Sequence, residues 1–318
     1  MTAWQPTTSL RNLRLRVKLL ACVRDFFAKR NVLEVETPLL SQHTVTDVHI
    51  DSFQTTYQNG KNTQHYFLQT SPEYAMKRLL AAGSGSIFQI CKAFRNSESG
   101  QQHNPEFTML EWYRPDFTHH ELMTEVDALL QLLLNTAPAE RVSYQDLWIK
   151  KIGINPHDCE LIELQRCIAK QGLTITSPID DKDTLLQLLM SHAIEPTLGL
   201  QAPLFIYDYP ITQAALAKIS GNPPVAERFE AYFQGVELAN GFHELTDATE
   251  QFTRFQREQD KRKAMHRLVP TIDARFIDAL THGLPSCSGV AVGLDRLLMI
   301  MANAKTITEV ISFPWERA

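Results

Sequence analysis

Two runs of β-forming residues that flank a polar loop, between Ile87 and Tyr113, constrain the fold of this chain most. The runs span residues 87–94 and 107–113, and both are rich in β-branched and aromatic side chains with partial apolar–polar alternation. This pattern predicts an antiparallel pair of strands. The loop between them carries charged and amide side chains: Arg95, Glu98, His103, Asn104 and Glu106. Such a loop is either an ordinary polar connection or a clamp over a ligand, in which Arg95 would fork onto a phosphate or carboxylate.

Composition places the chain among globular proteins. Its 318 residues are 44% hydrophobic and 21% charged, enough for a sizeable core, and the net charge of −5 does not support a general nucleic-acid surface. The five cysteines form no C-x-x-C pair, which excludes the common zinc and thiol-redox motifs and favours a reducing, cytoplasmic setting. No apolar run reaches membrane-spanning length, so we expect no membrane partner.

The N-terminal region predicts a long helix followed by a short strand. Residues 10–30 form an amphipathic pattern with Ser9 as a plausible N-cap. We expect the apolar stripe to comprise Leu13, Val17, Leu20 and Phe27, with Val23 close by, and the basic opposite face to be solvated. The run of residues 32–37 predicts a strand that Pro38 ends.

The middle of the chain predicts further strands and helices. Residues 66–69 predict a strand that leads into a helix over residues 74–82, where Glu73 either serves a site or complements the helix dipole. A helix is expected over residues 119–134. Residues 135–200 contain helical patches and are interpreted as an insertion, either a lid or a packing subdomain.

The C-terminal third predicts a strand over residues 204–209, then a hairpin that turns near Gln234-Gly235. Glu230 and Glu237, one on each arm, could converge on a hard cation. A charged helix is expected over residues 248–267. A glycine-bearing strand over residues 289–293 then enters a helix that begins near Asp295 and Arg296. Strand pairs that alternate with helices favour an antiparallel α+β fold over a doubly wound one.

Three segments resemble the sequence motifs of class II aminoacyl-tRNA synthetases, in order and content. The helix–strand–Pro38 segment resembles motif 1, Phe94 through Tyr113 resembles motif 2, and Gly289 to Arg296 resembles motif 3. With His103-Asn104-Pro105-Glu106-Phe107-Thr108-Met109 and the run of residues 237–245, they resemble the catalytic domain of lysyl-tRNA synthetase. The resemblance implies a mostly antiparallel sheet flanked by helices and one catalytic domain across residues 1–318.

The position of motif 1 narrows the resemblance. Because motif 1 begins almost at Ser9, we expect no anticodon-binding domain before it. The chain is then similar to the truncated paralogs that use ATP to ligate lysine, specifically (R)-β-lysine, to a lysine side chain of translation elongation factor P. Elongation factor P, lysine or β-lysine, Mg²⁺ and a second copy of the chain are the implied partners, and tRNA is not expected.

The resemblance also implies residue roles. Arg95 and Arg296 are the expected catalytic residues, because they would stabilise charge at the phosphates. The residues expected to bind ATP are Arg95, Asn96, Ser97, Glu98, His103, Asn104, Phe107, Glu237, Leu238, Gly293 and Arg296. Those expected to bind the amino acid are Ser71, Pro72, Glu73, Tyr113, Asn240, Glu244 and Ala291. Glu230 and Glu237 are the expected magnesium ligands.

Several positions depart from the lysyl-tRNA synthetase pattern. Ser97 stands where motif 2 normally has glutamate, so adenine or ribose recognition shifts to Glu98 or to backbone groups. Gln102 replaces arginine, and Ser71 and Ala291 replace alanine and glycine. The added methyl of Ala291 narrows the amino-acid pocket, which favours β-lysine by about 1–3 kcal/mol.

The same residues are also compatible with two other functions. One is a compact ligase that acts on tRNA or another amine, and the other is a non-catalytic regulatory paralog. The retention of Arg95, Glu230, Glu237 and Arg296 argues against a non-catalytic protein. The basic cluster over residues 257–267 is either a solvated face or a docking surface for acidic elongation factor P.

Overall fold

The computed structural model describes residues 4–174 and 179–318, so residues 175–178 of the expected insertion lie outside the described part. The chain forms two compact units. The first runs up to Asp116 and resumes at Leu245–Ala318, and the second is Phe117–Glu244. Within the described ranges, no helix combines the length and apolar character needed to cross a membrane.

The first unit is built on the predicted strand pair. Strands β5 (Ile87–Phe94) and β6 (Glu106–Pro115) are antiparallel, and β12 (Cys287–Gly293) pairs with β6, also antiparallel. The strand predicted over residues 32–37 is shorter than expected: β1 (Leu33–Glu34) pairs in parallel with β5. The antiparallel pairing of β5 with β6 confirms the strand pair predicted on either side of the polar loop.

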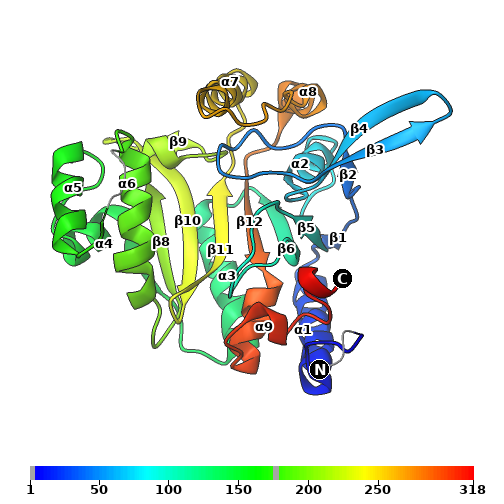
Figure 1. The fold of residues 1–318 in the computed structure, drawn as a ribbon, viewed down its shortest axis with the longest axis horizontal. Helices are drawn as coiled ribbons and strands as arrows, with labels where there is room; N and C mark the ends of the chain where they lie inside the picture. Colours follow the sequence, from blue (N-terminus) through cyan, green and yellow to red (C-terminus); the bar gives the residue numbers. More distant parts are fainter. Residues whose placement is uncertain (1–3, 175–178) are drawn as a thin grey trace. The chain divides into compact units, whose positions relative to one another are not determined.

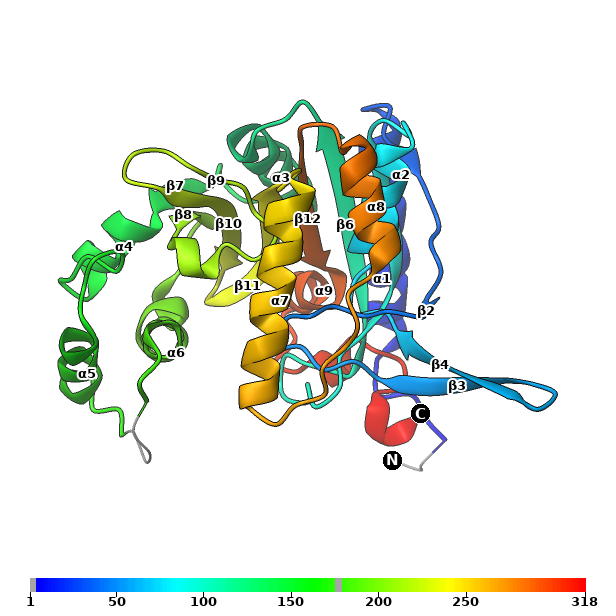
Figure 2. The same cartoon turned by 90° about the horizontal axis from the view of Figure 1, so that it is seen from above.

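A small second sheet and five helices complete the first unit. In Figures 1 and 2 the β3–β4 hairpin projects away from the rest of this unit. In the view of Figure 1, α2, α7 and α8 lie above the strands and α1 and α9 lie below them. The elements are β2 (Leu40–Ser41), β3 (Gln54–Asn59), β4 (Asn62–Leu68), α1 (Leu10–Ala28), α2 (Glu73–Ala81), α7 (Ala248–Ala264), α8 (Ala274–Gly283), α9 (Leu294–Ala302), η4 (Ile307–Glu309) and η5 (Trp315–Arg317).

Helix α1 covers one face of the strand pair through its C-terminal half. Phe27 stacks on Phe88 of β5 with ring centroids 4.5 Å apart and meets Trp112 of β6 edge-on at 5.2 Å. The buried residues of α1 are Leu19, Val23, Phe26 and Phe27. The predicted stripe is wrong in its N-terminal half, because Val17 is 67% exposed. Full burial begins only at Leu19, and Leu13 is half-buried.

The second unit contains the predicted hairpin. Strands β10 (Val225–Phe233) and β11 (Val236–His243) are antiparallel and turn at Gln234-Gly235, where both residues have positive φ, 53° and 74°. The remaining elements are β7 (Glu140–Ser143), β8 (Leu204–Tyr209), β9 (Ile219–Ser220), α3 (His119–Leu134), α4 (Tyr144–Lys151), α5 (Leu161–Lys170), α6 (Lys182–Leu189), η1 (Met190–Ile194), η2 (Glu195–Thr197) and η3 (Ile211–Gln213). Strand β8 pairs with β10 antiparallel and with β7 in parallel.

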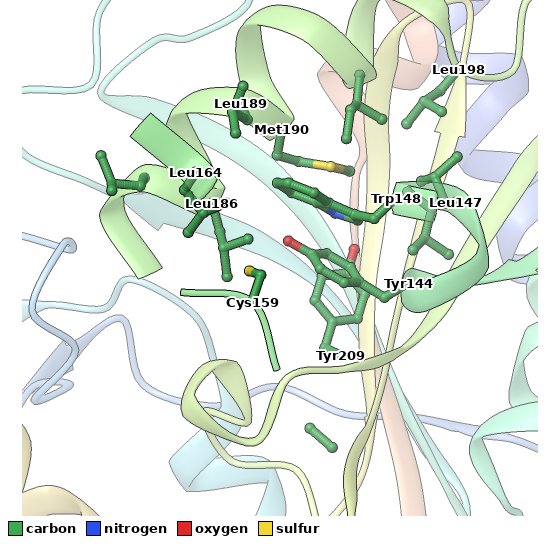
Figure 3. Packing of buried hydrophobic residues seen from close by; sticks show 14 of the residues in the cluster. Tyr144, Leu147, Trp148, Cys159, Leu164, Leu186, Leu189, Met190, Leu198 and Tyr209 are labelled. Atoms are coloured by element: carbon green, nitrogen blue, oxygen red, sulfur yellow. The ribbon is translucent and has the colours of Figure 1, made fainter. Parts of the chain in front are cut away.

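The described part of residues 135–200 packs onto these strands. Figure 3 shows Tyr144 and Trp148 of α4 in one apolar cluster with Leu186, Met190 and Tyr209, all nearly fully buried. The rings of Tyr144 and Tyr209 lie 4.6 Å apart. This shared core is the arrangement expected of a packing subdomain. Strand β7 and helix α4 were not predicted, because their apolar residues are too few to give a periodic signal.

Candidate active site

The strands of the first unit place two polar side chains on the face that α1 does not cover. Trp112 points toward Phe27 of α1, so strand alternation directs Glu111 and Tyr113 to the opposite face. The register puts Ala291 of β12 directly beside Glu111 and Gly289 beside Tyr113. Tyr113 and Ala291, both predicted to bind the amino acid, therefore share one face of the sheet.

Glu111 is a site residue that the sequence did not single out. The hydroxyl of Tyr113 donates to Glu111 Oε1 at 2.7 Å, and both residues are 2% exposed. Burial, with a further contribution from the charge of Glu111, raises the pKa of the nearby Cys91 thiol to about 12. The sequence could have indicated Glu111, because it lies two residues before Tyr113 in a predicted strand and side chains two residues apart share one face.

Arg95 follows β5 and reaches back over β6. Its guanidinium carbon lies 5.2 Å from the ring centroid of Phe107, within the range of a cation–π contact. Its Nη1 is 3.8 Å from Glu98 Oε1, too far for a hydrogen bond, and its buried Nε has no hydrogen-bond partner among the described residues. The guanidinium thus retains donors that an anionic ligand could satisfy.

Ser97 and its neighbours lie in the loop that follows Arg95. Ser97 is exposed with φ of 66°, and its N–H donates to Asn96 Oδ1 at 3.0 Å. The backbone of Asn96 is bound at 2.7 Å to the carbonyl of Asp51. The carboxylate of Glu98 lies close to Arg95, with 3.8 Å between Oε1 and Nη1, so the role expected of a glutamate at position 97 stays a prediction for Glu98.

Arg262 of α7 is buried and does not belong to the basic surface expected on this helix. It is 2% exposed and donates at 2.7 Å to Asp51, which places it inside the first unit. It also binds the carbonyl of Ile50 at 3.1 Å. The assignment of Arg262 to a solvated or docking face is therefore wrong, whereas Lys261 and Lys263 have no such buried contacts among the described residues.

Arg296 of α9 contacts His103 in the loop between β5 and β6. Arg296 Nη2 lies 2.6 Å from His103 Nε2. Burial and the positive charge of Arg296 lower the pKa of His103, so a neutral imidazole accepts this hydrogen bond. Gly293 caps α9 just before Arg296, and a Cβ there would lie 3.7 Å from Arg296 Cδ. A methyl group at Gly293 would therefore be in ordinary van der Waals contact with this arginine.

Asn104 has a positioning role in this conformation. Its amide nitrogen donates to the carbonyl of Glu106 at 2.6 Å, and its amide oxygen accepts from the N–H of Trp315 at 2.9 Å. The residue is 7% exposed. Both ends of the amide are thus engaged by backbone, which fixes the loop against the C-terminal segment.

One ion pair connects the three motif segments. Arg16 of α1 pairs with Asp295 of α9 and donates to the carbonyl of Val310 at 2.9 Å. Asp295, 2% exposed, also accepts the N–H of Thr108 in β6 at 2.6 Å. The expectation that the basic residues of α1 are all solvated is wrong for Arg16, since its guanidinium points into the unit.

The start of α2 holds the other residues expected to meet the amino acid. Pro72 is buried, Ser71 is half-buried, and Glu73 pairs with Lys77 at 2.6 Å one helical turn later. Lys77 is only 1% exposed. The charge of Glu73 therefore also compensates a buried ammonium group.

In the second unit, a β-bulge brings the two expected magnesium ligands to one face. The β10–β11 register pairs Glu230 with Asn240 but Tyr232 with Glu237, so Leu238 is the extra residue in β11. Tyr232 lies two residues after Glu230 and shares its face, and Glu237 joins them through the bulge. Leu238 itself is 2% exposed.

The two glutamates differ in their surroundings. Glu230 Oε1 binds Arg228 at 2.5 Å, and its Oε2 accepts from Tyr209 at 2.7 Å and Tyr232 at 2.6 Å. Burial, and then the charge of Glu230, raise the pKa values of both tyrosines. Glu237 is half-buried, so its carboxylate is the more accessible of the two. Carboxylate oxygens suit Mg²⁺, which keeps water and phosphate ligands of its own, so the donor set fits this ion.

Arg228 links this pair to Asn240. Its Nε donates to Asn240 Oδ1 at 3.2 Å, and its guanidinium lies 4.7 Å from the ring centroid of Tyr209. Glu244, which follows β11, is 2% exposed and forms a bridge with Ala217. The second unit thus places Glu230, Glu237 and Asn240 on one face.

Comparison with known proteins decides the family. The family model described as tRNA synthetases class II (D, K and N) matches residues 3–317. The chain belongs to this family. Proteins named elongation factor P--(R)-beta-lysine ligase from Vibrio vulnificus and Photobacterium profundum are each 52% identical to it, over 98% of this chain and 98% of their own. The protein of that name from Salmonella typhi is 51% identical over 99% of this chain and 98% of its own.

The class II assignment agrees with how the three motif segments fold. Motif 1 is helix α1 and the short strand β1, motif 2 is the β5–β6 pair with its loop, and motif 3 is β12 entering α9. The α+β class with mostly antiparallel strands, expected from the sequence, is confirmed.

Proposed function

We propose that this chain activates (R)-β-lysine with ATP and transfers it to a lysine side chain of translation elongation factor P. The observation that carries the proposal is the 52% identity, over nearly the full length of both chains, to proteins named for this ligation. The enzyme is a ligase that forms an amide bond while ATP is cleaved to AMP and pyrophosphate.

In the first step, the carboxylate of the amino acid attacks the α-phosphorus and pyrophosphate leaves. Arg95 neutralises charge on the α-phosphate and on the attacking carboxylate, a role supported by its unsatisfied Nε and its weak contact with Glu98. Arg296, which contacts His103, exchanges this neutral partner for the γ-phosphate, with which it forms the stronger charge-assisted contact.

The remaining motif 2 residues position the nucleotide. Phe107, already under the Arg95 guanidinium, stacks on adenine. Glu98 with the backbone of Asn96 and Ser97 reads the ring or ribose, and Asn104 holds the loop in place. Gly293 keeps space beside Arg296, and Leu238 offers an apolar contact.

Glu230 and Glu237 would hold Mg²⁺, with Glu237 as the more accessible ligand and Glu230 oriented by two tyrosine hydroxyls. An ion bound there would supply neutralisation of charge on the departing phosphates. Arg228 binds Glu230 and offsets part of its charge, and Glu237 also acts electrostatically on this arginine.

Recognition of the amino acid relies on buried carboxylates. Glu111, held by the Tyr113 hydroxyl, and Glu73 are the carboxylates of the first unit that receive an ammonium group, and Glu244 and Asn240 are the recognition residues of the second unit. Ala291 beside Glu111 and Ser71 near α2 narrow the space around the α-carbon, which favours the β-isomer. In the second step, the neutral acceptor amine attacks the activated carbonyl and AMP leaves.

A homodimer through α1 belongs to the same proposal. Leu10 and Val17 on α1 are 72% and 67% exposed, an apolar surface that a second copy would cover.

The direct test is intact-mass analysis of elongation factor P after incubation with enzyme, ATP, Mg²⁺ and each lysine isomer in turn. We expect one added lysyl mass, fastest with (R)-β-lysine. A parallel incubation replaces elongation factor P with tRNA. Acylated tRNA together with unmodified elongation factor P would favour the compact tRNA ligase, and modification of neither would favour a non-catalytic paralog.

A further inference from the structure

A buried cluster of two histidines and a carboxylate lies in the second unit. His119 begins helix α3, Glu227 is on β10 and His243 ends β11. Their ligand atoms all lie within 4.8 Å of one another, and among residues 4–174 and 179–318 this is the one such group of three metal-ligating side chains. His119 and His243 are 6% and 8% exposed, and the Glu227 side chain is 13% exposed.

The cluster is separate from the glutamate pair of the proposed active site. Asn240 and His243 lie three residues apart on β11, so strand alternation points their side chains to opposite faces, and Glu227 is hydrogen-bonded to His243. Arg228, Glu230 and Asn240 share one face, as their hydrogen bonds require. Glu227 and His243 therefore occupy the other face, which receives His119 from α3.

His119 has ring nitrogens that the protein leaves unsatisfied. Neither Nδ1 nor Nε2 makes a hydrogen bond to a described residue, although both are buried. Nδ1 lies 3.9 Å from Glu227 Oε2, and Nε2 lies 3.4 Å from Asp208 Oδ1. A buried imidazole with one nitrogen toward a shared ligand position and the other toward a carboxylate matches the arrangement found behind metal-bound histidines.

The charge of the cluster suits a cation. Glu227 places a carboxylate between two imidazoles, which gives a donor set of one anionic oxygen and two ring nitrogens. The Ser220 hydroxyl also donates to Glu227, so the protein itself orients this carboxylate.

We infer that His119 Nδ1, His243 Nδ1 and Glu227 Oε2 form a binding site for a divalent transition metal, best matched by Zn²⁺, with Asp208 orienting His119. Two imidazoles and one carboxylate are a common zinc donor set, whereas Mg²⁺ prefers oxygen alone. Tetrahedral zinc with bonds of about 2 Å needs donor atoms roughly 3.3 Å apart. His119 must approach Glu227 by about half an ångström, and the close His243–Glu227 contact must open.

The site would serve structure and not the ligation chemistry, because it faces away from Arg228 and Glu230. A bound ion would tie the start of α3 to the β10–β11 hairpin, which comes much later in the sequence. The competing explanation is a hydrogen-bonded His243–Glu227 pair beside a neutral His119, with no ion.

The test measures metal directly. The purified chain is stripped with a chelator, reloaded with Zn²⁺ alone, and assayed for bound metal by mass spectrometry and for affinity by competition with a chromophoric chelator. We expect one Zn²⁺ per chain. His119→Gln and His243→Gln should each weaken binding more than about 100-fold, and Asp208→Asn, which removes only the orienting carboxylate, by about 10–100-fold.

The matched control is His192→Gln, which removes an exposed histidine of the same unit and should bind zinc as the parent chain does. Cobalt-loaded parent protein gives a second measurement that no variant's folding can affect, since tetrahedral Co²⁺ absorbs strongly in the visible range. A stripped parent chain that takes up no Zn²⁺ at micromolar concentration, or Co²⁺ without this absorption, overturns the inference. Unchanged zinc affinity in both histidine variants would do the same.

Discussion

Arg95 is the residue on which the proposed chemistry depends most. Because it would stabilise charge that develops at the α-phosphate, Arg95→Ala should lower the rate of lysyl-adenylate formation by at least about 100-fold in pyrophosphate exchange. Arg95→Lys should recover little of this rate, because an ammonium group cannot bind a phosphate or carboxylate in the bidentate manner of a guanidinium. Arg166→Ala on the exposed face of α5 is the control and should retain full activity. Near-parental exchange in Arg95→Ala would remove Arg95 from the mechanism.

Ala291 tests the selectivity for the β-isomer. Its side chain lies beside Glu111 in the sheet, so Ala291→Gly removes one methyl from the face that carries Tyr113 and Glu111. We expect pyrophosphate exchange with α-lysine to rise about 10-fold or more, in line with the worth of one methyl group. An unchanged α-lysine rate would show that selectivity resides elsewhere. Val290→Ala, on the opposite face, is the control.

Glu258 on α7 predicts a pH dependence of stability. Burial raises its pKa from an ordinary value of 4.5 to about 7, although the Thr46 hydroxyl donates to it. A raised carboxyl pKa gives stability that is complete below pH 4.5 and is lost as pH rises through 7. In urea unfolding, the free energy of unfolding of the parent should fall by up to about 3 kcal/mol relative to Glu258→Gln between about pH 4.5 and 8. The exposed Glu316→Gln should give no such difference.

Single residues were predicted well where a local motif marks them and poorly where tertiary packing decides their role. Arg95 and Arg296 meet polar loop groups as expected of a clamp. Glu111 and Arg262 were missed or misplaced, because a buried charge in a strand or helix is recognisable only from its partners. The assigned ligand roles themselves stay predictions.

At the scale of elements, the Arg16–Asp295 pair ties α1, β6 and α9 together. Arg16→Met should destabilise the first unit by about 3 kcal/mol, because it leaves the buried Asp295 carboxylate without its cation. The double variant Arg16→Met/Asp295→Asn should recover much of that loss in a double-mutant cycle. Arg24→Met breaks an exposed pair with Glu34 and should cost less than about 1 kcal/mol. Equal losses in Arg16→Met and Arg24→Met would contradict this account.

Strands and turns with strong local signals matched the structure, and short elements did not. The β5–β6 pair and the Gln234-Gly235 turn were predictable from β-forming runs and from a turn glycine. Strands of two to four residues such as β1 and β7 derive their existence from a neighbouring strand, which a single-sequence pattern cannot reveal. The buried stripe of α1 was misplaced at Val17, because helical periodicity does not tell which apolar positions a neighbouring element covers.

At the scale of the whole molecule, the proposed homodimer is testable through α1. Val17→Glu puts a charge on an apolar surface that is 67% exposed, so it should shift the chain to monomer in sedimentation velocity without lowering monomer stability. Ile162→Glu, at a 47% exposed apolar position of the second unit, is the control and should leave association unchanged. A parent chain that sediments as a monomer at all concentrations would refute the dimer.

The bulge at Leu238 limits which changes of length this hairpin can accept. Glu230 and Glu237 share a face only because β11 carries one residue more than its partner at that point. Deleting a single residue between them would restore a regular ladder and turn one glutamate to the face of His243. Insertions and deletions between the two glutamates should therefore be rejected during evolution even where substitutions are accepted. The length of this hairpin is then constrained independently of which residues occupy it.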